Sequence, residues 1–192
     1  HSAGFSVRVT DDVRKSVVFF GYADTSRPSG IVCIGTGFLL IYKGGPYLVT
    51  AKHLSHQLGA DPFLLRVNRK DGTAENLHAD GVQWFDHSDP EVDASATPLH
   101  IGNDTAYAAM YLSGDEMLLS PEKLIQEDIG IGSLTYTVGL FRLLSGERRN
   151  LPICHFGAVA ALPEDERIPI VDWTDPAGKR RLRVEGYLVE SQ

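Results

Sequence analysis

Apolar residues along the chain gather in short runs that turn residues separate. The runs are rich in β-branched and aromatic side chains, and several alternate with polar positions, as strands do. Predicted strands cover residues 16–22, 31–42, 47–50, 63–68, 81–85, 93–99, 134–141, 152–162, 168–173 and 182–190. Gly35 and Gly37 lie inside the second run, where they predict a β-bulge or the close approach of another segment.

Helical patterns are few and short. Residues 54–58 are long enough for one helical turn, and residues 120–124 begin with a serine cap followed by proline at the first helical position. Many strands with so few helices predict an all-β barrel or sandwich, and not alternating strands and helices. The stretch 103–132 is the natural boundary between two all-β halves.

Composition narrows the class of protein. The chain has 192 residues, of which 43% are hydrophobic and 22% are charged, as is ordinary for a globular protein. The net charge of −7 argues against nucleic acid as a partner, because neutralising phosphates needs a basic surface. The one basic cluster, at 179–183, is predicted to be the solvated tip of a hairpin.

Nothing in the sequence predicts a membrane partner. No apolar run approaches the roughly 20 residues that cross a bilayer, and residues 1–20 lack the pattern of a signal peptide. The chain has two cysteines, Cys33 and Cys154, where a secreted protein of this size often has more. The sequence leaves the localisation open, and these features favour the cytoplasm. A disulfide bond between the two cysteines stays an open alternative.

One predicted strand leads directly to a histidine. Residues 47–49 run into Thr-Ala-Lys at 50–52, and His53 follows. Forty residues later, Asp93 stands where a loop enters a strand. A carboxylate that orients a histidine and stabilises its cation must be held by rigid backbone, and this placement provides that. We therefore predict that the two side chains lie within hydrogen-bond distance.

Several segments resemble those of trypsin-like serine proteases of the bacterial type. Thr-Ala-Lys-His at 50–53 is similar to the Thr-Ala-Ala-His motif of that family, and Gly-Thr-Gly-Phe at 35–38 to the strand before it. Val-Asp-Ala at 92–94 resembles the family's Asp-hydrophobic-Ala segment. Val-Gly-Leu-Phe at 138–141 and Asn-Leu-Pro-Ile at 150–153 look like the opening strands of its second barrel.

The resemblance implies a two-barrel fold and peptide-bond hydrolysis by a His-Asp-Ser triad acting on a polypeptide substrate. His53 would be the general base, and Asp93 would fix its tautomer and stabilise its cation. Residues 1–102 would form the first barrel, which carries both. Residues 103–132 would connect the barrels, and residues 133–192 would form part of the second. The resemblance implies no metal or organic cofactor.

The nucleophile motif of the family, Gly-x-Ser-Gly, does not occur in the sequence. Gly-Tyr-Leu-Val-Glu at 186–190 resembles the strand just before it. Ser191 lacks the glycines that let a backbone present N–H groups to an oxyanion. We expect the serine and the remaining strands C-terminal to Gln192, in the same polypeptide or in a cleaved second chain, so that the chain alone is inactive. The alternative is a pseudoprotease, a trypsin-fold interaction module that has lost its serine.

Other residues of the sequence have suitable chemistry but a poorer context than this pair. Asp86 and Asp89 are rival acids in the preceding polar loop, but no Ala-containing strand follows either of them. His53 and His56 have the spacing of two metal ligands on a helical turn, yet no clustered Cys, Glu or third His completes a site. The adjacent Cys-His at 154–155 is on a predicted strand, so its side chains point to opposite faces and cannot pair.

Overall fold

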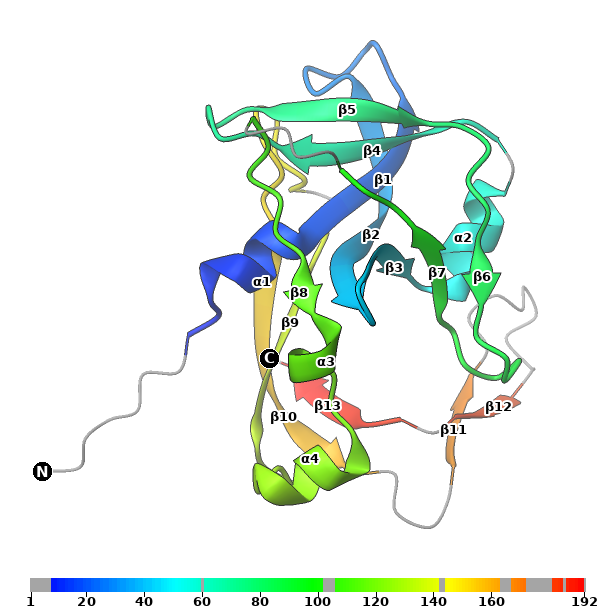
Figure 1. The fold of residues 1–192 in the computed structure, drawn as a ribbon, viewed down its shortest axis with the longest axis vertical. Coiled ribbons are helices and arrows are strands. Elements are labelled where there is room, and N and C mark those ends of the chain that lie inside the picture. Colours follow the sequence, from blue (N-terminus) through cyan, green and yellow to red (C-terminus); the bar gives the residue numbers. More distant parts are fainter. Residues whose placement is uncertain are drawn as a thin grey trace, which may run out of the picture.

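The structure is a computed structural model, and it is mainly β (Figure 1). It describes residues 8–59, 61–101, 106–141, 144–162, 167–171, 181–184 and 186–191. Within these ranges, no helix has both the length and the apolar character needed to cross a membrane.

The earlier part of the chain forms one eight-stranded sheet. Its strands are β1 (Val17–Ala23), β2 (Ile31–Tyr42), β3 (Gly45–Thr50), β4 (Phe63–Asn68), β5 (Ala74–Ala79), β6 (Phe85–Asp86), β7 (Ser95–Pro98) and β8 (Leu112–Ser113). Antiparallel neighbours follow the order β5-β4-β1-β2-β3-β7-β6, and β8 pairs in parallel with β2. The predicted strands 31–42 and 63–68 are confirmed at both ends. The predicted strand 81–85 is wrong except for Phe85, which begins β6.

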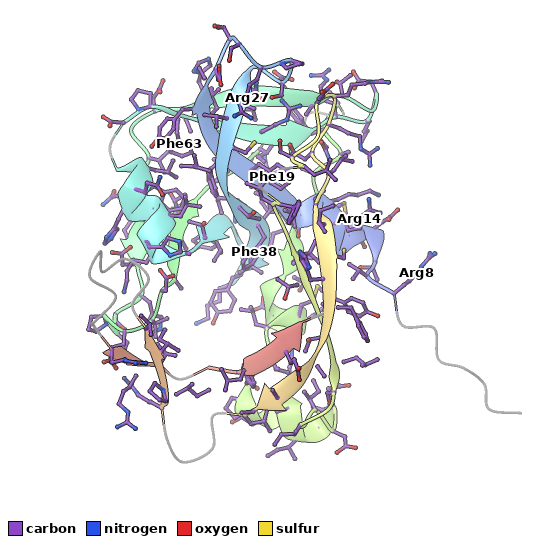
Figure 2. All side chains as sticks on the ribbon, turned by 180° about the vertical axis from the view of Figure 1, so that it is seen from behind. Arg8, Arg14, Phe19, Arg27, Phe38 and Phe63 are labelled. Atoms are coloured by element: carbon purple, nitrogen blue, oxygen red, sulfur yellow. The ribbon has the colours of Figure 1, made fainter. Side chains whose placement is uncertain are left out.

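The sheet curves around a core of apolar side chains. Phe20 of β1, Leu39 of β2 and Leu65 of β4 are at most 2% exposed. Trp84, just before β6 at one end of the strand order, stacks on Phe63 of β4 near the other end, with ring centroids 6.4 Å apart. Phe63 is labelled among the packed side chains in Figure 2. Because the two ends of the strand order meet across the core, the sheet wraps round it as a barrel does.

Two glycines of β2 allow other segments to approach closely, as predicted. A Cβ atom at Gly35 would lie 2.3 Å from Cδ2 of Leu54, in the helix that follows β3. A Cβ atom at Gly37 would lie 2.7 Å from the ring of Phe20. The pairing of β1 with β2 also shifts register between Phe20 and Gly21, which is the predicted bulge. Gly35 therefore sets how closely the next helix packs on the sheet.

Four short helices lie in the described ranges: α1 (Asp11–Ser16), α2 (Lys52–Leu58), α3 (Gly114–Met117) and α4 (Pro121–Gln126). Helix α4 begins as predicted, with Pro121 in its first turn and the Ser120 hydroxyl accepting a hydrogen bond from the Lys123 N–H. Helix α2 is longer than the single turn predicted. It begins at Lys52, after the N-cap residue Ala51, and ends at Leu58. The C-cap residue Gly59 has a φ of 59°, which glycine adopts without strain.

The later part of the chain forms two smaller sheets. Strand β10 (Ile153–Ala161) lies between β9 (Leu134–Gly139) and β13 (Leu188–Ser191), and β11 (Ile168–Val171) pairs with β12 (Arg181–Val184). The predicted single strand 182–190 is wrong, because its first residues belong to β12 and its last to β13. Gly186 lies between them, and glycine weakens a strand. The predicted strand 168–173 begins with β11, but residues 172–173 lie outside the described ranges.

A buried polar cluster joins the two parts of the chain. Arg66 of β4 is 2% exposed and donates hydrogen bonds to the carbonyl oxygens of Ser29 and Glu147. Asn150 is fully buried; its side chain donates to the Arg66 carbonyl oxygen (2.7 Å), and its backbone N–H donates to Oδ1 of Asn68 (2.7 Å). These bonds fix the loop before β10 to β4, although the segments are about eighty residues apart in sequence.

Candidate active site

Helix α2 presents two histidines to solvent on one face. Leu54 and Leu58 are buried on the other face, where Leu54 occupies the space beside Gly35. His53 and His56 are three positions apart, so their side chains are neighbours on the exposed face. These side chains are 52% and 63% exposed. Packing of the two leucines therefore fixes the direction in which both histidines point.

Asp93 makes the contact with His53 that the sequence predicts. Its Oδ2 atom lies 2.6 Å from Nδ1 of the His53 ring, and its Oδ1 atom accepts a hydrogen bond of 2.8 Å from the His53 backbone N–H. The second bond satisfies an N–H group at the start of α2 that has no partner within the helix. Ala51, the N-cap residue, has no side chain that could do so. Asp93 therefore caps the helix and orients the histidine on it.

The other ring nitrogen of His53 is the one available for chemistry. When Nδ1 carries the proton and donates it to Asp93, the neutral ring holds its lone pair on Nε2. Such a nitrogen can accept a proton from a nucleophile, and the carboxylate then stabilises the resulting cation. Among the residues that the structure describes, no further side chain hydrogen-bonds to this ring.

A second histidine–aspartate pair lies beside the first. Nε2 of His56 lies 2.7 Å from Oδ2 of Asp86, and the Ser95 hydroxyl donates a hydrogen bond to the other oxygen of this carboxylate. The Ser95 hydroxyl, and after it His56, hold the pKa of Asp86 below its ordinary value. This pair occupies Nε2 of its histidine. Of the two histidines, His53 is the one whose Nε2, the nitrogen that a serine triad uses, is not held by its aspartate.

The loop between β6 and β7 carries Asp93 and is held by a cation from the later part of the chain. Arg167, just before β11, donates to Oδ2 of Asp89 (2.8 Å) and to Oε2 of Glu91 (2.7 Å). Figure 1 shows this loop beside β11 and β12. The Glu91 backbone N–H, together with Arg167, lowers the pKa of Asp89. The carboxylate of this rival acid is thus engaged by Arg167 and not by His53.

The remaining candidates lie apart from this site. Cys33 and Cys154 are free thiols, so the disulfide alternative is wrong. His155 has its ring against Phe141, with centroids 6.4 Å apart. Within the described ranges, no group of three His, Cys, Asp or Glu side chains could hold a metal ion. The basic cluster at 179–183 falls partly outside the described residues, which resume at 181 with β12.

The sequence pattern missed the second pair and the cation that holds the loop. From the sequence, Asp86 is only a rival to Asp93. A signal for two pairs was nevertheless present, because two histidines three positions apart are followed by two acids near one loop. Arg167 carries no comparable signal. It is 76 residues from Glu91, and no local pattern joins two segments so far apart.

No protein-family model matches the chain, and no curated protein sequence matches it. Solved structures do match the chain. One is the crystal structure of Deg5, a trypsin-like serine protease of the DegP/HtrA kind. It matches with a TM-score of 0.55 at 16% sequence identity, over 94% of this chain and 70% of the Deg5 chain.

The fold of the chain resembles that of a trypsin-like protease. The likeness to Deg5 confirms the predicted all-β class and this architecture, and the smaller sheets β9-β10-β13 and β11-β12 are consistent with an incomplete second barrel. At 16% identity the likeness describes the fold. The chemistry of the site therefore depends on the geometry of His53 and Asp93 themselves.

Proposed function

We propose that this protein is a serine endopeptidase in which His53 is the general base and Asp93 orients it. The observation that carries the proposal is the 2.6 Å contact between Asp93 and Nδ1 of His53, because it leaves Nε2 free to accept a proton. The likeness to Deg5 supports a protease of this fold. The substrate would be a polypeptide, and the reaction needs no cofactor.

In the proposed reaction, a serine hydroxyl attacks the carbonyl carbon of the peptide bond. Its proton moves to Nε2 of His53 as the O–C bond forms, and the ring becomes a cation whose Nδ1–H faces Asp93. The proton then passes to the leaving amine as the C–N bond breaks, and water hydrolyses the acyl-enzyme through the same two transfers. Asp93 holds both the ring and the backbone of His53, so the ring keeps its orientation between steps.

We propose that the nucleophilic serine lies C-terminal to Gln192, in the same polypeptide or in a cleaved second chain that pairs with β13. Two features of β13 support this. In the described part of the chain its pairing partner is β10, on one side. Its residues Leu188 and Val189 are 45% and 42% exposed. A further strand would pair the open edge and cover these side chains.

We also propose a division of the chain into a first barrel (1–102), a connection (103–132) and part of a second barrel (133–192). Sheet membership supports it, because β1 to β7 belong to one sheet and β9 to β13 belong to the two others. The connection contributes β8, which pairs with β2 of the first sheet. The boundary at 102/103 falls outside the described residues.

Labelling with a fluorophosphonate probe tests the proposed function. A natural protein that extends beyond residue 192 should label at one serine, and His53→Ala should remove most of the labelling because the serine loses its base. His78→Ala is the matched control, since it removes an exposed histidine from β5 in the same barrel. The 192-residue chain by itself should not label.

Two outcomes would count against the proposal. Labelling of the extended protein that survives His53→Ala would remove His53 from the base role. No labelling of a folded, extended protein would favour the trypsin-fold interaction module instead.

A further inference from the structure

One carboxylate, that of Asp86, links the two segments that bear the proposed catalytic pair. Its Oδ2 atom lies 2.7 Å from Nε2 of His56, which is one helical turn after His53 on α2. Its Oδ1 atom accepts a hydrogen bond from the hydroxyl of Ser95, a residue only 2% exposed. Asp86 therefore contacts helix α2 with one oxygen and strand β7 with the other.

Asp86 and Ser95 also form the base of the loop that carries Asp93. They are directly paired residues of β6 and β7, and Asp93 comes two residues before Ser95. On its other side, Ser95 pairs with Thr50, the last residue of β3, which leads into α2. A shift of this loop base relative to α2 would change the position in which Asp93 meets the helix.

The loop is tied to α2 at a second point, and on the helix the two ties lie on either side of His53. Nζ of Lys52, the first residue of α2, donates a hydrogen bond of 2.7 Å to the carbonyl oxygen of Pro90. His56 is poorly suited to be the base of a second catalytic pair, because its Nε2 already contacts Asp86. His56 and Asp86 are also poorly suited to bind a metal ion, since the described ranges contain no group of three potential ligands.

We propose that Asp86 is a positioning residue: through His56 and Ser95 it holds the Asp93 loop against α2, so that Nδ1 of His53 stays on Asp93. The inference rests on the proposed function for the role of the pair. The geometry it concerns is measurable without catalysis, in the 192-residue chain itself.

The test reads the tautomer of His53 from the ¹⁵N chemical shifts of its ring, recorded at a pH where those shifts themselves show one protonated and one unprotonated ring nitrogen. In the unaltered chain the Nδ1–H form should dominate, since Asp93 accepts that proton. Asp86→Ala should lower the ratio of the Nδ1–H to the Nε2–H form by about tenfold, the order expected for one charge-assisted hydrogen bond. Ser95→Ala removes one of the two contacts and should have a smaller effect.

Two controls separate positioning from a general effect of charge or stability. Asp80→Ala removes the same charge from an exposed residue between β5 and β6, outside the loop that carries Asp93, so the ratio should not change. At the exposed position of His56, His56→Gln keeps an N–H donor for Asp86 and should keep the ratio, whereas His56→Leu should lower it. This second pair decides the question if Asp86→Ala does not fold.

The outcomes distinguish the two proposals. If Asp93→Ala changes the tautomer ratio but Asp86→Ala and His56→Leu do not, the positioning role is wrong and the catalytic pair stands. If Asp93→Ala itself leaves the ratio unchanged, Asp93 does not orient His53 and the proposed function loses its basis.

Discussion

The two parts of the chain bury their apolar side chains to very different degrees. Of the 16 buried hydrophobic residues in the described ranges, 15 precede residue 102, and only Val159 belongs to the later strands. The large hydrophobic residues that stay exposed show the reverse, since 12 of 16 follow residue 116. Burial of such side chains is the main favourable term in folding. The earlier part therefore has a core of its own, and the later part has the beginnings of one.

The comparison explains why the geometry of the His53–Asp93 pair can be well defined although the later strands bury few side chains. His53 and Asp93 both belong to the part with the full core, where Leu54 and Leu58 anchor helix α2. Exposed residues such as Phe156, at 46%, belong to the part that we propose further strands would cover. The geometry of the pair should therefore survive changes that loosen the later strands.

The largest expected difference is in amide hydrogen exchange. In the 192-residue chain, amides of β1, β2 and β4 should exchange only through global unfolding, whereas those of β9, β10 and β13 should exchange through local opening. We expect at least about a hundredfold difference in protection factor between these two sets of strands. Equal and high protection in a monomer would contradict the comparison, because it would mean that the later strands are already complete.

A matched pair of phenylalanine substitutions sharpens the same comparison. Phe20→Ala removes a fully buried ring and should lower the free energy of unfolding by about 3–5 kcal/mol. Phe156→Ala removes a ring that is 46% exposed and should cost less than about 1.5 kcal/mol. Urea unfolding measures both values. Similar costs for the two would mean that Phe156 is covered in solution.

The polar cluster between the two parts should have an intermediate effect. Asn150→Ala removes the donor to the Arg66 carbonyl oxygen inside the protein, and we expect a loss of about 1–3 kcal/mol in the free energy of unfolding. Arg149→Ala changes the exposed neighbouring residue and should stay within about 0.5 kcal/mol of the unaltered chain. If the two variants unfold at the same urea concentration, this cluster does not stabilise the contact between the parts.

The smallest expected effect concerns the contacts of Arg167 with Asp89 and Glu91, which are exposed and screened by salt. Because folding lowers the pKa of Asp89, its contribution is present at neutral pH and is lost as the pH falls through that lowered value. Arg167→Ala should therefore lower the melting temperature slightly at pH 7, and the difference should vanish in strong acid or high salt. Arg181→Ala on β12 is the control. A difference that persists in acid would assign the effect to packing.

Local sequence pattern predicted best those strands whose ends are set by turns, for a physical reason. The runs Ile31–Tyr42 and Phe63–Asn68 are each bounded by turns, so their ends are set locally. The run 182–190 stays strand-like throughout, but the partner changes from β11 to β10 near Gly186. Pairing partners depend on distant segments, and so does the parallel pairing of β8 with β2.

The candidate site likewise contains residues that a local motif predicts and contacts that depend on distant segments. His53 and Asp93 could be predicted because each stands at the end or start of a strand with a short, specific motif around it. The contact of His56 with Asp86 depends on the register of β6 against β7, and that of Arg167 depends on how two distant loops meet. The spacing of the two histidines and the two acids hints at the first contact without fixing it, and the contact of Arg167 leaves no local trace. The cap that Asp93 provides to α2 was missed for the same reason.

The most direct test of the account measures kcat for peptide hydrolysis by the natural protein that extends beyond residue 192. His53→Ala and Asp93→Asn should each lower kcat by about 10⁴-fold or more, as loss of a triad member does in serine proteases. The kcat of the double variant should be close to that of the less active single variant, because the two residues act as one unit. Full activity in either single variant, or losses that multiply in the double variant, would contradict the claim that His53 and Asp93 form the catalytic pair.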